Sequence, residues 1–218
     1  AGGAGAGAAG AGGAGAGLAV PAWWPGVEGI DLLGEAPAVP EGARVCGRDA
    51  LEAVRVEAGV PAMGAELTEK TIPAEAGVVG SSVSFTKGCY TGQELVARLD
   101  ARGNRVPKRL LGVVVATGHL DSLGGPGDLG DVGGPGEGGD PGAGSDLGGG
   151  GLPPVGSELV VAASGKVVGT LTSVAFSPGL EAAVALAYVR REVDAPADLG
   201  LSWDGVTVPA SVRELPLR

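Results

Sequence analysis

The clearest capacity for chemistry in this sequence belongs to Cys89, in the segment KGCYTGQE (87–94). Thr91 and Glu94 have the T-x-x-E spacing of a capping box, which predicts that a helix begins in this segment. The positive end of a helix and the ammonium group of Lys87 both favour a thiolate over a thiol. These features favour a reactive cysteine. The alternative is a small buried hydrophobic residue, which is the usual environment of a free cysteine.

Two elements are expected to position this cysteine. The helix that follows it should reach about Arg98 and stop near Gly103, because glycine commonly follows the C-terminus of a helix. Residues 82–85 predict a short strand that leads into the cysteine loop, and residues 70–77, with their proline, predict a loop before that strand.

A second helix is predicted over Arg48–Ala58, ended by Gly59, with Leu51, Val54 and Ala58 on its apolar side. Arg55 and Glu57 lie two positions apart, so their side chains do not face one another as a pair spaced three or four apart would. From the residues alone we expect an exposed pair of charges that contributes about 0–1 kcal/mol.

The segment KGCYTGQE, followed by LVARLDARG, resembles the signature of the YgfZ-type folate-binding proteins, within the superfamily of the glycine cleavage T protein, an aminomethyltransferase. Further motifs lie upstream in family-like order, namely ALEAVRVEAG (50–59), Pro61, EKTIPAEAG (69–77) and VSFTK (83–87). An ordered series of motifs is more specific than any one of them. The resemblance implies tetrahydrofolate or a derivative as the cofactor.

The resemblance also assigns residues to a folate site. In the family the glutamate of R-x-E-x-G faces the pterin ring, so Glu57 is the leading ligand, and a carboxylate can accept both adjacent pterin donors as a charge-assisted fork. Arg55, in the same motif, is a further residue expected to bind the cofactor. Glu75 is expected either to shape the loop around this pocket or to stabilise a turn. Lys87 is expected to face the folate glutamate tail or to favour the thiolate, and Tyr90 either stacks on the ligand or packs.

The chain divides into three parts. Residues 1–17 are only Ala and Gly and predict a flexible linker. We expect 18–108 to be the C-terminal portion of a folate-binding domain whose front this chain lacks. The rest, 109–218, predicts a small antiparallel β-barrel or sandwich, and the resemblance favours the barrel, so the fold class is α+β. The strands predicted there are 110–116, 158–162, 166–175, 183–190 and 206–212; an earlier strand is predicted over 27–33.

The net charge of −10 is unevenly distributed. Residues 118–156 are rich in Gly, Pro and Asp, contain no Lys or Arg, and predict a disordered acidic insertion between the first two barrel strands. Residues 87–109, in contrast, carry an excess of basic side chains. This segment is either a docking site for an anionic ligand or partner or a solvated charged face.

Several classes of function are not expected. No run of bulky apolar residues is long enough to span a membrane. Cys46 and Cys89 are the two cysteines, and their spacing predicts neither a metal site nor a disulfide framework, which favours a reducing cytoplasm. Direct RNA binding is not expected either, because the basic segment lacks interleaved aromatic residues for base stacking.

Two functions follow from the resemblance. The first is a folate-binding accessory protein that supports iron–sulfur cluster assembly or repair in client enzymes, including tRNA-modifying enzymes, with Cys89 as the working thiol. The alternative is a tetrahydrofolate-dependent aminomethyltransferase of the glycine cleavage type, which transfers a one-carbon unit. In the T proteins that activity relies on an aspartate in the front half, which this chain does not contain, and KGCYTGQE does not mark those proteins. The first function is therefore preferred, and a role without enzymatic activity of its own is favoured.

Overall fold

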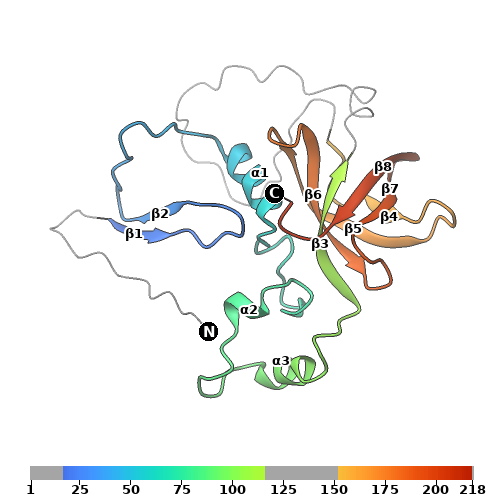
Figure 1. Cartoon of the computed structure of the whole chain (residues 1–218), viewed down its shortest axis with the longest axis horizontal. Helices are drawn as coiled ribbons and strands as arrows, with labels where there is room; N and C mark the ends of the chain where they lie inside the picture. Colours follow the sequence, from blue (N-terminus) through green and yellow to red (C-terminus); the bar gives the residue numbers. More distant parts are fainter. Residues whose placement is uncertain (1–16, 116–151, 218) are drawn as a thin grey trace.

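The computed structural model describes residues 17–115 and 152–217 (Figure 1). The predicted linker and the predicted acidic insertion therefore lie outside the described residues, except for residue 17 and residues 152–156. The elements in chain order are β1 Leu18–Pro21, β2 Ile30–Leu33, α1 Arg48–Ala58, α2 Val79–Ser82, α3 Gln93–Asp100, β3 Lys108–Val115, β4 Glu158–Val160, β5 Val167–Ser177, β6 Ala182–Arg190, β7 Ala197–Trp203 and β8 Val206–Arg213.

The strands from β3 onward form a closed antiparallel barrel in the order β3-β6-β5-β4-β7-β8, so the predicted barrel is confirmed. Its interior is filled by branched aliphatic side chains, among them Leu111, Val113, Leu201 and Val212, each at most 1% exposed. Such side chains suit a pleated surface that is buried on one face. The barrel core is therefore complete within the described residues.

Five of the barrel strands were predicted and β7 was not. Its sequence, ADLGLSW, has a glycine at its centre, which weakens a strand pattern. The structure gives the reason for Gly200: a Cβ there would lie 2.9 Å from Thr207 Cγ2 on β8 and 3.0 Å from Val160 Cγ2 on β4. The glycine lets the neighbouring side chains approach the backbone, and only the assembled barrel shows this.

Helix α1 has the predicted bounds and ends at Gly59, which adopts φ +74°. Its predicted buried side is right at Ala58, which is buried, and wrong at Leu51, which is 59% exposed; Ala53 and Val56 are buried instead. The helix packs on the outside of the barrel against β5 and β6 (Figure 1), where Ala53 and Val56 join a second core cluster with Leu186. This covering explains why β6 is buried on both of its faces.

The segment between α1 and the barrel departs from prediction at one point. No strand forms over 82–85; instead the short helix α2 ends at Ser82 and an irregular segment leads to Cys89. The loop predicted over 70–77 is confirmed. The strand predicted over 27–33 is shortened to β2, which pairs with β1 as an antiparallel hairpin.

Candidate functional site

The loop before α3 holds Cys89 at the surface. Its side chain is exposed, so the alternative of a buried hydrophobic cysteine is wrong. The ammonium of Lys87 lies 5.0 Å from the ring centre of Tyr90, within the range of a cation–π contact. The loop therefore presents a thiol, an ammonium and an aromatic ring within four consecutive residues.

The predicted capping box does not form. The N-cap of α3 is Gly92, which has no side chain to cap the helix and adopts a left-handed conformation with φ +84°. Gln93 Oε1 instead accepts a hydrogen bond from the backbone N–H of Tyr90, at 3.3 Å. Thr91 is left outside the helix because the left-handed residue changes the chain direction after it. The predicted end of the helix is confirmed, since α3 stops at Asp100 and Gly103 has φ +72°.

Arg55 lies on the last turn of α1 and is 9% exposed, so the expected exposed charge pair is wrong. Its Nη1 donates to Val60 O at 2.6 Å and to Glu66 Oε2 at 3.1 Å, and its Nη2 donates to Ser173 Oγ on β5 at 2.6 Å. Nε and Nη2 also donate to the carboxylate of Glu52. The guanidinium therefore joins α1, the following loop and the barrel.

Glu66 is the acidic partner in this network, and its carboxylate is fully buried. Oε1 accepts from Ser173 Oγ at 2.6 Å and Oε2 accepts from the backbone N–H of Ala62 at 2.9 Å, in addition to Arg55. Burial alone would lower the pKa of the Arg55 guanidinium, but hydrogen bonding and attraction from Glu52 and Glu66 raise it on balance. The buried arginine stays charged.

Sequence reasoning missed Glu66 and Ser173. The two residues lie 107 positions apart, and neither belongs to a motif. The signal that existed was Ser173 itself, a polar residue within the apolar pattern of β5, next to a register shift between Leu171 and Ser173. A β-bulge of this kind redirects a side chain, and here it accompanies a serine aimed at the network.

Glu57 is 3% exposed and lies two residues after Arg55, on the same last turn. Its backbone carbonyl accepts a hydrogen bond of 2.7 Å from the N–H of Leu217 near the C-terminus. The C-terminal end of the chain therefore lies beside α1 (Figure 1). A buried carboxylate at this point has the acceptor chemistry that suits a pterin.

Glu75 is also buried and lies beside a separate aromatic contact. Its Oε2 is 3.9 Å from Lys108 Nζ, and that ammonium lies 4.4 Å from the ring centre of Tyr188. The Tyr188 hydroxyl donates to the backbone carbonyl of Glu66 at 2.9 Å. Burial raises the pKa of the Tyr188 phenol, and the negative charges of Glu75 and Glu66 raise it further. The backbone carbonyl of Glu75 also accepts a hydrogen bond of 2.8 Å from the N–H of Leu110, which joins its turn to β3.

The predicted site residues thus form two groups. Arg55, Glu57 and Glu75 lie in or beside the contact between α1, the following loop and the barrel, whereas Lys87, Cys89 and Tyr90 share the loop before α3. In Figure 1, α3 lies at the bottom of the view, below both α1 and the barrel.

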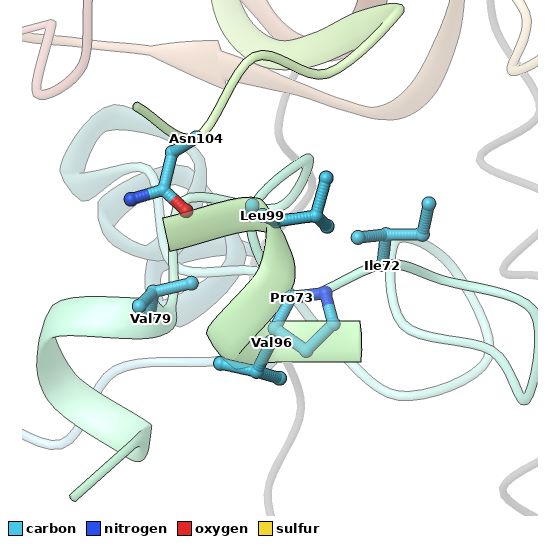
Figure 2. Close-up of a pocket in the computed structure, with 7 residues that line it drawn as sticks. Ile72, Pro73, Val79, Val96, Leu99 and Asn104 are labelled. Atoms are coloured by element: carbon cyan, nitrogen blue, oxygen red, sulfur yellow. The ribbon is translucent and has the colours of Figure 1, made fainter. Parts of the chain in front are cut away.

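The described residues form a small apolar hollow where the loop before α2 meets α2 and α3. Figure 2 shows Ile72 and Pro73 of the loop, Val79 of α2, and Val96 and Leu99 of α3 around it. This hollow has no room for a water molecule, so it is packing rather than a ligand site. A shallow second hollow lies on the barrel surface beside β3, β7 and β8.

Neither hollow includes Glu57. Its carboxylate has the acceptor chemistry that fits the donors of a pterin. Within residues 17–115 and 152–217, no group of three or more His, Cys, Asp or Glu residues could hold a metal ion. None of the helices described is long and apolar enough to cross a membrane.

Comparison with known proteins supports the fold described above. Residues 147–217 match the glycine cleavage T-protein C-terminal barrel domain. The chain is 30% identical over 180 residues to an aminomethyltransferase from Streptomyces avermitilis, a match that covers 81% of this chain and 39% of that protein. It is 46% identical over 52 residues to the tRNA-modifying protein YgfZ of Yersinia pestis, covering 23% of this chain and 16% of that protein.

A solved structure agrees with these matches. The fold resembles the glycine cleavage system aminomethyltransferase T from Bartonella henselae with a TM-score of 0.53 and 19% identity, covering 78% of this chain and 38% of that one. The chain therefore spans about two fifths of the length of the aminomethyltransferases that it matches. Together, the barrel match and the aminomethyltransferase match show that the chain is similar to proteins of the glycine cleavage T-protein superfamily, and the solved structure shows that it shares their fold.

Proposed function

We propose that the protein is a tetrahydrofolate-binding accessory protein of the YgfZ type, which supports iron–sulfur cluster assembly or repair in client enzymes, including enzymes that modify tRNA. The observation that carries this proposal is the surface loop KGCYTGQE with its exposed Cys89. The partial match to YgfZ and the barrel match support it. Because Cys89 is exposed, its thiol is accessible to a partner protein. A reducing cytoplasm suits such a thiol.

Glu57 is the residue that would hold the pterin in this proposal. A carboxylate accepts the adjacent amino and ring N–H donors of a pterin, and burial strengthens such bonds. Lys87 would face the anionic glutamate tail of the folate, and Glu75 would hold the loop that precedes α2. Bound folate would supply a one-carbon carrier. Glu57 would supply the hydrogen-bond acceptor for its pterin, and Lys87 would supply the positive charge opposite its glutamate tail.

Folate binding is tested by calorimetric titration of the whole chain with a stable reduced folate such as 5-formyltetrahydrofolate. Glu57→Ala should weaken binding by about 1.5–3 kcal/mol, the range for a hydrogen bond to a charged group. The exposed Glu41→Ala variant is the matched control and should bind as the wild type does. Equal affinity of the Glu57→Ala and wild-type proteins would remove Glu57 from the site.

The role of the thiol is tested separately in cells that lack their own copy of the protein. Cys89→Ser should keep folate affinity and abolish support of iron–sulfur enzymes, measured as client activity in extracts. Cys46→Ser removes the other exposed cysteine and should leave both properties unchanged. Loss of folate affinity together with client activity in Cys89→Ser would assign the cysteine a structural role.

A second candidate is an aminomethyltransferase that transfers a one-carbon unit to tetrahydrofolate. It is favoured by one specific observation, the match to the Streptomyces avermitilis enzyme across 81% of this chain. A one-carbon transfer assay with tetrahydrofolate as acceptor separates the two proposals. Turnover that survives Cys89→Ser would support the transferase and contradict the accessory role of the thiol.

A further inference from the structure

The last turn of α1 and its C-cap carry three residues of one motif, and all three contact parts of the chain that lie far away in sequence. Arg55 bonds to Ser173, 118 positions later, in the barrel. Gly59 lies under Leu215, in the C-terminal tail. Glu57, between them, is the proposed folate ligand. The turn that presents this carboxylate is therefore held from both sides by the barrel domain.

The guanidinium of Arg55 has no donor left for a ligand. An arginine carries five N–H donors. Nε and one Nη2 donor bind Glu52, the other Nη2 donor binds Ser173, and the two Nη1 donors bind Val60 O and Glu66. A folate could gain a bond from Arg55 only by breaking one of these buried contacts, which would leave a buried acceptor unsatisfied.

The C-terminal tail packs against two glycines, one at the end of this turn and one on β3. A Cβ at Gly59 would lie 2.7 Å from Leu215 Cβ, and a Cβ at Gly112 on β3 would lie 2.5 Å from Leu217 Cδ2. Real Cβ atoms do not approach so closely, so both positions need glycine for the tail to seat. Once seated, the tail donates the Leu217 N–H to the carbonyl of Glu57 at 2.7 Å.

We propose that Arg55, Ser173 and Leu217 are positioning residues, which make the barrel domain and the C-terminal tail hold Glu57 in the orientation that binds folate. This inference rests on the proposed folate site. In it, R-x-E-x-G works as one unit: the arginine fastens the turn to the barrel, the glutamate meets the ligand, and the glycine receives the tail. Folate affinity then depends on barrel residues that never touch the ligand.

The test measures 5-formyltetrahydrofolate affinity of the full chain in a double-mutant cycle. Ser173→Ala should weaken binding about tenfold, because loss of one buried hydrogen bond near a charge costs that order. In the Glu57→Ala background the same change should have no further effect. Ser157→Ala is the matched control, since Ser157 is also a buried serine but bonds to Pro154 O, away from α1; its affinity should equal that of the wild type.

A second measurement does not depend on folate. The backbone N–H groups of Gly59 and Val60 bond within the last turn, to Val56 O and Arg55 O. Hydrogen–deuterium exchange at these two amides should quicken in Ser173→Ala and in Leu217→Gly, and should not change in Ser157→Ala. Leu217→Gly serves if Ser173→Ala does not fold.

The outcomes separate the two proposals. If Ser173→Ala binds folate as the wild type does, or loses affinity equally with and without Glu57, the positioning role is overturned. Unchanged amide exchange in both the Ser173→Ala and Leu217→Gly variants overturns it as well. If the wild-type chain shows no folate affinity but the two amides exchange faster in these variants, the proposed function fails while the mechanical coupling of the turn to the barrel stands.

Discussion

Replacement of Gly59 by alanine tests the contact between the tail and α1 most directly. The change has two separable costs. Gly59 has φ +74°, and a left-handed backbone costs a residue with a Cβ about 1–2 kcal/mol. The new methyl would also lie 2.7–3.0 Å from the Cβ and both Cδ atoms of Leu215, and overpacking of this kind costs about 1–3 kcal/mol. The free energy of unfolding should fall by about 2–5 kcal/mol in total.

Gly77 provides a matched control for the backbone cost. It has φ +73°, and a Cβ built on it meets no atom within 4 Å. Gly77→Ala should therefore cost about 1–2 kcal/mol, the backbone part alone. The free energies of unfolding would be measured by urea titration followed by far-ultraviolet circular dichroism. The difference between the two alanine variants is the cost of the contact with Leu215.

A compensating change provides the second check. Leu215→Gly removes the three atoms nearest to the new methyl, so the double variant Gly59→Ala/Leu215→Gly should be more stable than the sum of the single effects by about 1–3 kcal/mol. Equal costs at Gly59 and Gly77, or strict additivity of Gly59→Ala with Leu215→Gly, would refute the docking of the tail on this turn.

Two further predictions concern the polar groups around this turn. Arg55→Met should destabilise the protein by about 3–5 kcal/mol, because it leaves the buried carboxylate of Glu66 without its cationic partner. The double variant Arg55→Met/Glu66→Met should cost less than Arg55→Met alone, and urea unfolding measures both. A cost of Arg55→Met below that of a surface ion pair, about 1 kcal/mol, would contradict the buried network. Tyr90→Phe leaves Tyr188 as the sole tyrosine, so near-ultraviolet absorbance should report a phenol pKa above the ordinary 10.0, raised by burial and by the charge of Glu75. Because the pKa of Tyr188 is higher in the folded state than in the unfolded state, the stability that its neutral phenol contributes is fully present below about pH 10 and is lost as the pH rises through the raised pKa. Tyr188→Phe should remove this contribution to the loss of stability at alkaline pH. A titration midpoint at or below 10.0 would contradict the raised pKa.

Much of the backbone could be predicted from the sequence because local patterns decide it. Helix α1 has its predicted bounds, since good helix formers run up to a glycine that can adopt the left-handed conformation. Five barrel strands lie where β-branched residues alternate with turn residues; their pattern predicted a barrel or a sandwich, and the family resemblance favoured the closed barrel that the structure shows. The assignment of Cys89 and Glu57 to function stays a prediction, drawn from motifs.

Local patterns failed where a distant residue or an unusual backbone angle decided the outcome. Thr91 and Glu94 have the spacing of a capping box, yet the left-handed Gly92 moves the helix start past Thr91. Gly200 weakens the pattern of β7, although its neighbours in the barrel require a glycine there. In both cases the glycine was visible in the sequence, but the conformation or the close approach that it serves was not.

The environment of the R-x-E-x-G turn was decided by tertiary structure alone. The spacing of Arg55 and Glu57 indicated that their side chains do not face one another, and from the residues alone both charges were expected to be exposed to solvent. The barrel instead buries both, because α1 lies across β5 and β6 and brings Ser173 against the guanidinium. The sequence by itself determined which residues form helix α1 and five of the barrel strands. Which charged side chains are buried depended on the packing of segments more than 100 residues apart, and no local pattern predicts this packing.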